Sequence, residues 1–137
     1  MQTVRRRTKT GGVILTKYGN KQYIAFNRKF DSKKEGLRYI ELKTLQMGGE
    51  ISELECQKSF ELLPTRHYGN KTVQGVRYIA DFYYYDKALK SYVAEDTKGY
   101  PTDVYKLKKK LFLDKYVSKG SLIFFENGEK MIYYKKN

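Results

Sequence analysis

The segment over residues 77–99 constrains the fold most, because it reads as two strands joined by a short turn. Aromatic and β-branched residues, which sheets favour, fill residues 78–85 and 92–97. Between them lies a polar loop over residues 86–91, a length that is common in hairpins. The pattern therefore predicts a long antiparallel hairpin.

The register of this hairpin decides which acidic side chains share a face. If Tyr85 pairs with Tyr92, Asp81 lies directly opposite Asp96, and both carboxylates point to the same face of the sheet. A register shifted by one residue would put the two aspartates on opposite faces. The charge pair therefore depends on the pairing of the two tyrosines.

Two carboxylates that face each other are unusual in a structural hairpin. At a separation of about 5 Å they repel by roughly 3 kcal/mol at an effective dielectric constant of about 20. A divalent cation reverses the sign of this interaction, because Mg²⁺ prefers oxygen ligands. Lys98 shares the face of Asp96, whereas Glu95 points to the other face. The alternative interpretation is a solvated strand face, on which Asp and Lys residues are common.

Paired carboxylates with a nearby lysine suit metal-assisted phosphodiester hydrolysis. The ion polarises the phosphate and helps to generate hydroxide. The lysine orients the water or stabilises the charge that develops in the transition state.

The charge of the chain points to a polyanionic partner. Its 137 residues include 28 Lys and Arg against 15 acidic residues, a net charge of +13, and nucleic acid is the leading candidate. No long apolar run or lipidation signal indicates association with a membrane, and no secretory signal indicates export of the protein. A single cysteine, Cys56, excludes a cysteine-rich zinc site and fits a cytoplasmic protein, and a single histidine, His67, gives a His-based metal cluster little support.

The length predicts a single domain over residues 13–137, preceded by a flexible basic arm over residues 1–12. Arg5, Arg6 and Arg7 in this arm are candidate phosphate contacts. A tail without a function has the same composition.

A first helix is predicted over residues 31–47, before the hairpin. Ser32 followed three residues later by Glu35 matches a capping box, and Asp31 is an alternative cap. Glu35 has two compatible interpretations. It is a structural cap, or, stacked over Tyr39 and Leu42, it faces the sheet and reaches a metal.

A second helix is predicted from Thr102 or Asp103 to about residue 116. Its apolar residues at helical spacing, which are expected to face the core, are Val104, Leu107 and Leu111. Its lysines on an opposite arc, a solvated face or a set of phosphate contacts, are Lys106, Lys109 and Lys110.

The remaining segments complete a mixed order of elements. A strand is expected over residues 54–63 and a polar turn over residues 64–71, with His67 as a surface residue or a phosphate contact. Two closing strands over residues 122–125 and 131–134 flank Asn127-Gly128, a strong hairpin signal. The order αβββαβ predicts an α/β fold with a central mixed sheet flanked by helices.

This order, with Asp81 followed by Asp96-Thr97-Lys98, resembles the restriction-endonuclease-like core of the PD-(D/E)xK nuclease superfamily. The likeness is closer to a small phage-encoded family assigned to that superfamily, which is similar to Holliday junction resolvases. It covers about residues 18–125 and rests on residues 30–35, 50–51, 57, 78–82, 95–99 and 102–108. Two departures are Ala80, in place of the proline of the motif, and Asp96, where glutamate is commoner.

The resemblance implies a metal-dependent endodeoxyribonuclease that hydrolyses phosphodiester bonds, with branched DNA as one substrate in phage recombination, replication or packaging. Mg²⁺ (or Mn²⁺) would be bound by Glu35, Asp81, Asp96 and the carbonyl of Thr97, with Lys98 positioning the water. Accessory positions are Gln57, Lys106 and Glu95, and Glu95 leaves the choice of the third-motif ligand open. The expected DNA contacts are Arg5, Arg6, Arg7, Lys33, Lys34, Lys106, Lys109 and Lys110.

The resemblance also bears on partners. Resolvases act as symmetric dimers, so a homodimer that works in the host-cell cytoplasm is consistent with it, without a membrane or a small-molecule cofactor. Two alternatives without chemistry are a basic nucleic-acid-binding protein on the same fold and a factor that binds an acidic protein.

Overall fold

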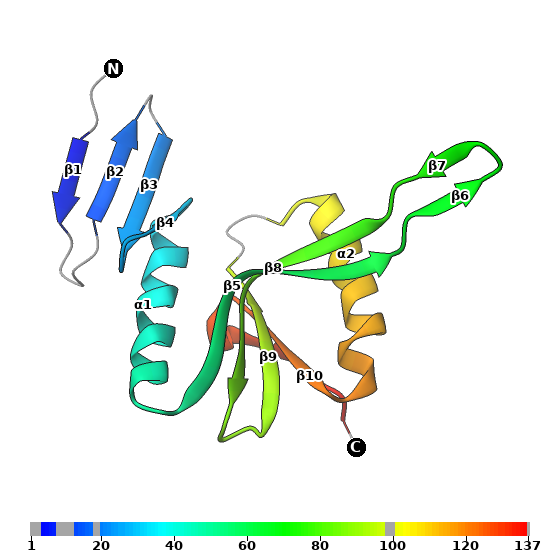
Figure 1. Ribbon diagram of the computed structural model, residues 1–137. Helices are drawn as coiled ribbons and strands as arrows, with labels where there is room; N and C mark the ends of the chain where they lie inside the picture. Colours follow the sequence, from blue (N-terminus) through cyan, green and yellow to red (C-terminus); the bar gives the residue numbers. More distant parts are fainter. Residues whose placement is uncertain (1–3, 8–12, 18–19, 98–100, 137) are drawn as a thin grey trace. The chain divides into compact units, whose positions relative to one another are not determined.

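The computed structural model describes residues 4–7, 13–17, 20–97 and 101–136 (Figure 1). The chain forms two compact units, Met1–Ile51 and Ser52–Asn137. This division differs from the expected arm over residues 1–12 followed by one domain.

The N-terminal unit combines an antiparallel sheet with one helix. Its strands, in spatial order, are β1 Val4–Arg7, β2 Val13–Lys17, β3 Asn20–Ala25 and β4 Arg28–Phe30. The described part of the expected flexible arm is therefore strand β1. Helix α1 (Lys33–Met47) follows, and the Ser32 side chain accepts a hydrogen bond from the Glu35 backbone N–H at 3.1 Å, which confirms the predicted cap.

Helix α1 buries the side that carries Glu35, Gly36, Tyr39 and Leu42. At Gly36 a Cβ would lie 2.0 Å from the ring of Tyr23 in β3, so this contact requires glycine. The close approach of helix and strand positions Glu35 within the N-terminal unit.

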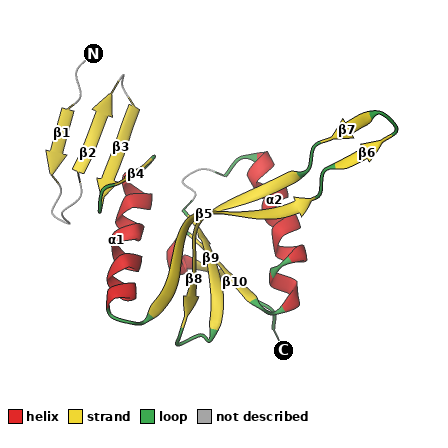
Figure 2. Ribbon diagram, in the orientation of Figure 1, coloured by secondary structure: helices red, strands yellow, loops and turns green. Residues whose placement is uncertain are grey.

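The C-terminal unit is built on a mixed sheet of order β11-β10-β9-β8-β5 (Figure 2). Strand β10 runs parallel to β9, whereas the β8–β9 and β10–β11 pairs are antiparallel. The strands are β5 Ile51–Leu63, β8 Val76–Asp86, β9 Ser91–Asp96, β10 Leu122–Glu126 and β11 Met131–Tyr133; the helices are α2 Asp103–Lys115, η1 Val117–Lys119 and η2 Gly128–Lys130. The predicted α/β class, mixed sheet and αβββαβ order are confirmed, with additional elements inserted.

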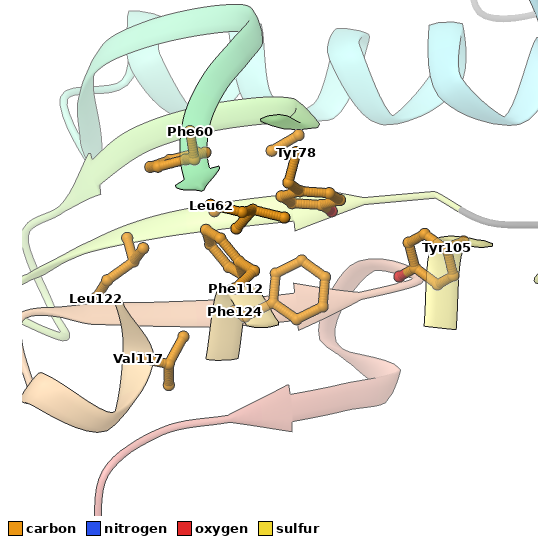
Figure 3. Close-up of a cluster of buried hydrophobic side chains, with 10 residues drawn as sticks. Phe60, Leu62, Tyr78, Tyr105, Phe112, Val117, Leu122 and Phe124 are labelled. Atoms are coloured by element: carbon orange, nitrogen blue, oxygen red, sulfur yellow. The ribbon is translucent and has the colours of Figure 1, made fainter. Parts of the chain in front are cut away.

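Helix α2 packs an aromatic side onto the sheet (Figure 3). The ring centroid of Phe112 lies 4.9 Å from that of Phe60 and 4.8 Å from that of Tyr78. The residues of this core are Phe60, Leu62, Tyr78, Ala80, Ala94, Tyr105, Phe112, Val117, Leu122 and Phe124. The helix thus buries its large aromatic side chains, which remove more surface from water than aliphatic ones.

The expected core side of α2 was wrong. Val104, Leu107 and Leu111 are exposed, because Tyr105 and Phe112 occupy the side that faces the sheet. The helical spacing of the three aliphatic residues is real, but it marks an outer face.

The predicted register of the hairpin is confirmed as far as the pairs Tyr85–Tyr92 and Phe82–Glu95. The regular pairing ends there, one position before Asp81 and Asp96. Ala80 and Tyr83 both pack on the α2 side, although two residues three positions apart normally point to opposite faces of a strand. The alternation of β8 therefore shifts by one between them, as it does at a β-bulge.

A second hairpin replaces the expected polar turn over residues 64–71. Strand β6 (Arg66–Tyr68) pairs antiparallel with β7 (Lys71–Val73) between β5 and β8. It projects from the far ends of these strands, beyond α2 (Figure 1). Strands of three residues are too short to show a period of two in the sequence.

Candidate functional site

Asp96 ends strand β9 on the α2 side of the sheet and is fully buried, with 0% of its surface exposed. The Tyr78 hydroxyl donates a hydrogen bond to Asp96 Oδ2. Asp96 is therefore held in place by a tyrosine of the neighbouring strand.

Asp81 is half-buried in β8, beside the end of β9. Its Oδ2 accepts hydrogen bonds from the backbone N–H and the Oγ1 hydroxyl of Thr97, each at 2.8 Å. Two donors from one residue orient this carboxylate, although Asp81 and Asp96 are not paired in the sheet.

The contacts of Tyr78 and Thr97 connect the surroundings of the two predicted acids, and the Tyr78 hydroxyl has a raised pKa. Burial raises its pKa most, followed by the negative charge of Asp96 and the hydrogen bond to it, and the charge of Asp81 raises it further. Asp81 is hydrogen-bonded to Thr97, which directly follows Asp96 in the chain, so both aspartates lie at the end of β9. The structure thus brings the two predicted acids near each other, with Tyr78 hydrogen-bonded to Asp96.

Glu126 is an acid at this site that the sequence analysis missed. It is the register partner of Asp96 on the parallel strand β10. Tyr105 of α2 donates a hydrogen bond to its Oε2 at 2.5 Å, and Lys109 Nζ lies 3.1 Å from the same atom. In Figure 3 the hydroxyls of Tyr105 and Tyr78 lie at the same end of the core. The sequence feature that could have identified Glu126 is an acid at the end of an apolar strand, directly before Asn127-Gly128.

Hydrogen bonds keep Glu126 ionised. Burial raises its pKa, but hydrogen bonds from Tyr105 and Lys109 and the charge of Lys109 outweigh burial, so the net shift is downward. Lys109 was expected on the arc of α2 that faces away from the core. It is instead turned towards Glu126 and Tyr133, because the carboxylate and the ring attract it.

Glu95 points to the opposite face of the sheet, as predicted. It pairs with Phe82 in β8 and Phe125 in β10, and it is fully buried. The Tyr84 hydroxyl donates a hydrogen bond to Glu95 Oε2. The structure therefore separates Glu95 from Asp81 and Asp96.

The other predicted site residues have separate positions. Lys98 lies outside the described residues, and Glu35 is buried in α1 of the N-terminal unit. Gln57 is exposed in β5 with a left-handed φ of 55°. The predicted DNA contacts whose side chains are exposed are Lys33, Lys34, Lys106 and Lys110, while Arg5, Arg6 and Arg7 belong to strand β1.

The donor chemistry of Asp81 and Asp96 fits Mg²⁺. Among the described residues, no group of three or more His, Cys, Asp or Glu side chains is arranged to hold a metal. Mg²⁺ commonly takes only one or two protein carboxylates and completes its octahedron with waters and phosphate oxygens. Asp81 and Asp96 are two such carboxylates, and the metal-binding roles predicted for them and for the Thr97 carbonyl stay predictions.

The chain belongs to the family described as protein of unknown function DUF1064, whose model matches residues 15–126. This match includes Glu35, Asp81, Asp96 and Glu126. No curated protein and no solved structure matches the chain. None of the helices in the described part is long and apolar enough to cross a membrane.

Proposed function

We propose that this protein is a Mg²⁺-dependent endodeoxyribonuclease. The observation that carries the proposal is that Asp81 is hydrogen-bonded to Thr97, the residue directly after the buried Asp96, so that two acids lie together at the end of β9. The net charge of +13 supports a polyanionic substrate. The resemblance to PD-(D/E)xK nucleases supports the same reaction class.

The residues of the chain would have distinct roles. Asp81 and Asp96 would hold the metal, which when bound polarises the scissile phosphate and lowers the pKa of a water. Thr97 fixes the orientation of Asp81 through two hydrogen bonds. Tyr78 does the same for Asp96, and its raised pKa keeps the hydroxyl proton in that bond. Lys98 would orient the attacking water, as the resemblance implies, and the role of Glu35 as a metal ligand stays a prediction.

Burial of Asp96 and Glu126 beside each other gives a cation a further reason to bind. Negative charges at adjacent positions of parallel strands repel each other, and burial lowers the dielectric constant between them. Lys109 offsets the charge of Glu126. A divalent ion at Asp96 and Asp81 would offset the remaining negative charge of these side chains.

The direct test incubates the protein with linear, supercoiled and four-way-junction DNA, with Mg²⁺ and with EDTA. We expect cleavage by the wild type in Mg²⁺ only, and none by Asp96→Ala. A matched control is Glu61→Ala, an exposed acid of β5 that pairs with Lys115, which should cleave like the wild type.

Two results would contradict the proposal. Equal cleavage by the wild type and Asp96→Ala would identify a contaminant. Salt-sensitive binding without cleavage of any of the three substrates would support the non-catalytic nucleic-acid-binding alternative.

The substrate class has its own test. Resolution of a four-way junction requires paired cuts on two strands and hence two active sites related by symmetry. Sedimentation should then give a dimer. A monomer that cleaves linear DNA would keep the nuclease and exclude the resolvase subtype.

A further inference from the structure

The β6–β7 hairpin is a projecting ribbon with a defined base. At Gly75 a Cβ would lie 2.4 Å from the carbonyl oxygen of Leu63, so the two strands approach closely there. The Gly75 N–H also donates to Thr65 Oγ1 at 3.0 Å. These contacts fix the backbone at the base of the hairpin, where it leaves the sheet.

The tip is a tight two-residue turn. Tyr68 pairs with Lys71, which leaves Gly69 and Asn70 as the turn residues. Gly69 has a φ of +64° at the first position, as a type II′ hairpin turn requires. The ribbon is therefore a regular hairpin that stands clear of the α2 core (Figure 1).

The two faces of this ribbon differ in chemistry. Opposite partners share a face, so Arg66 and Val73 lie on the same face as Tyr68 and Lys71. This face, here called the basic face, also has an apolar component, because Tyr68 is 62% and Val73 55% exposed.

The other face carries His67 and Thr72. The Nδ1 atom of His67 lies 3.0 Å from Thr72 Oγ1, so these two side chains hydrogen-bond each other.

The cations of the basic face have no partner within the described part of the chain. No side-chain hydrogen bond, ion pair or ring contact there involves Arg66, Tyr68 or Lys71. Residues 64–77 contain no acidic residue at all. The ribbon therefore presents uncompensated positive charge and an exposed aromatic ring on one face.

We propose that the β6–β7 hairpin is an arm that inserts its basic face into a groove of duplex DNA, an inference that rests on DNA as the substrate in the proposed function. Arg66 and Lys71 would contact phosphates on the walls of the groove. Tyr68 would pack on sugar or base edges between them. The major groove of B-DNA admits a two-stranded β-ribbon, and no acid repels the backbone.

The test measures duplex binding in EDTA, where no metal-dependent cleavage occurs, by fluorescence anisotropy over a range of salt concentrations. The double variant Arg66→Ala/Lys71→Ala should bind at least about tenfold more weakly, and its slope of log affinity against log salt should fall by about 2. Tyr68→Ala should weaken binding with an unchanged slope. The matched control, His67→Ala/Thr72→Ala, changes the opposite face and should bind like the wild type.

Two outcomes with duplex DNA and one with single-stranded DNA would overturn the proposed role of the hairpin. One is wild-type affinity and slope for Arg66→Ala/Lys71→Ala, and the other is an equal loss in the His67→Ala/Thr72→Ala control. An equal loss on single-stranded DNA would also overturn insertion into a duplex groove. Circular dichroism should show every variant folded, because all of these side chains are exposed.

A parallel cleavage assay in Mg²⁺ separates this inference from the proposed function. If the wild type binds and cleaves while the arm variants bind like it, the arm is excluded and the nuclease stands. If the wild type binds without cleavage and the arm variants lose binding, the nuclease is excluded and the arm stands.

Discussion

Asp96 and Glu95 are neighbours on β9, and the contrast between their surroundings separates a candidate site from a structural acid. Both side chains are fully buried, and each accepts a hydrogen bond from a tyrosine of β8. Their register partners on β10 differ: Glu126 lies beside Asp96, whereas Phe125 lies beside Glu95. Burial and a tyrosine donor are therefore common to both positions and do not by themselves identify a functional acid.

The difference lies in the partners of each acid on the neighbouring strands. Glu126 lies beside Asp96, while the register partners of Glu95 are Phe82 and Phe125. Neighbouring carboxylates favour a cation, because their mutual repulsion is offset by a positive charge. The comparison predicts that chemistry depends on Asp96 and that stability depends on both acids.

The largest expected effect is on cleavage. Asp96→Asn and Asp81→Asn keep the shape of each side chain but remove the charge that would bind the proposed metal. Each should lower the Mg²⁺-dependent cleavage rate about a thousandfold, equivalent to about 4 kcal/mol of transition-state stabilisation. Glu95→Gln should cleave within about tenfold of the wild type, and a loss as large as that of Asp96→Asn would break the comparison.

Removal of the two tyrosine hydroxyls should have a similar effect on stability. Tyr78→Phe and Tyr84→Phe each leave a buried carboxylate without one donor, which costs about 1–3 kcal/mol of unfolding free energy in denaturant titrations. Only Tyr78→Phe should change the Mg²⁺ concentration required for half-maximal cleavage, because Tyr78 orients Asp96. A shift with Tyr84→Phe instead would reverse the assignment of the two faces.

The hydrogen bonds of Glu126 predict a pH-dependent stability. Because the pKa of Glu126 is lowered from its ordinary value of 4.5, ionisation stabilises the fold above pH 4.5, and this contribution is lost as the pH falls through the folded-state pKa. Glu126→Gln should therefore cost about 1.5–3 kcal/mol near neutral pH, and the difference from wild type should shrink in acid. The control Glu61→Gln, which removes an exposed ion pair, should cost less than about 1 kcal/mol.

The smallest expected effect is on the unfolding free energy alone, at a position where no effect on cleavage is expected. Lys90, exposed in the β8–β9 turn, has a left-handed φ of 53°. Lys90→Gly should raise the unfolding free energy by up to about 1 kcal/mol, because glycine adopts this conformation without a steric cost. Cleavage should stay at the wild-type rate. A thermal midpoint below that of the wild type would contradict the expectation.

The elements whose residue pattern extends over many positions could be predicted from the sequence. The two aromatic runs and the polar loop predicted the long hairpin, and the pairing of Tyr85 with Tyr92 that was assumed from them is the observed one. The cap candidates predicted the start of each helix to within one residue, and Ser32 and Thr102 are the observed caps.

The parts that depend on contacts between distant residues could not be predicted. The shift in alternation after Ala80 and the parallel pairing that brings Glu126 beside Asp96 follow from packing across the sheet. The rotation of α2, which exposes Leu107 and turns Lys109 inward, depends on which side buries more aromatic surface. Spacing along one segment contains no information on these choices.

Direct binding of Mn²⁺ to the purified protein tests the central claim, that the Asp96 side and not the Glu95 side is the metal site. Titration calorimetry should detect binding by the wild type and by Glu95→Gln. Asp96→Asn should bind at least about tenfold more weakly, since it loses a charged ligand. Wild-type affinity in Asp96→Asn, or its loss in Glu95→Gln, would contradict the account.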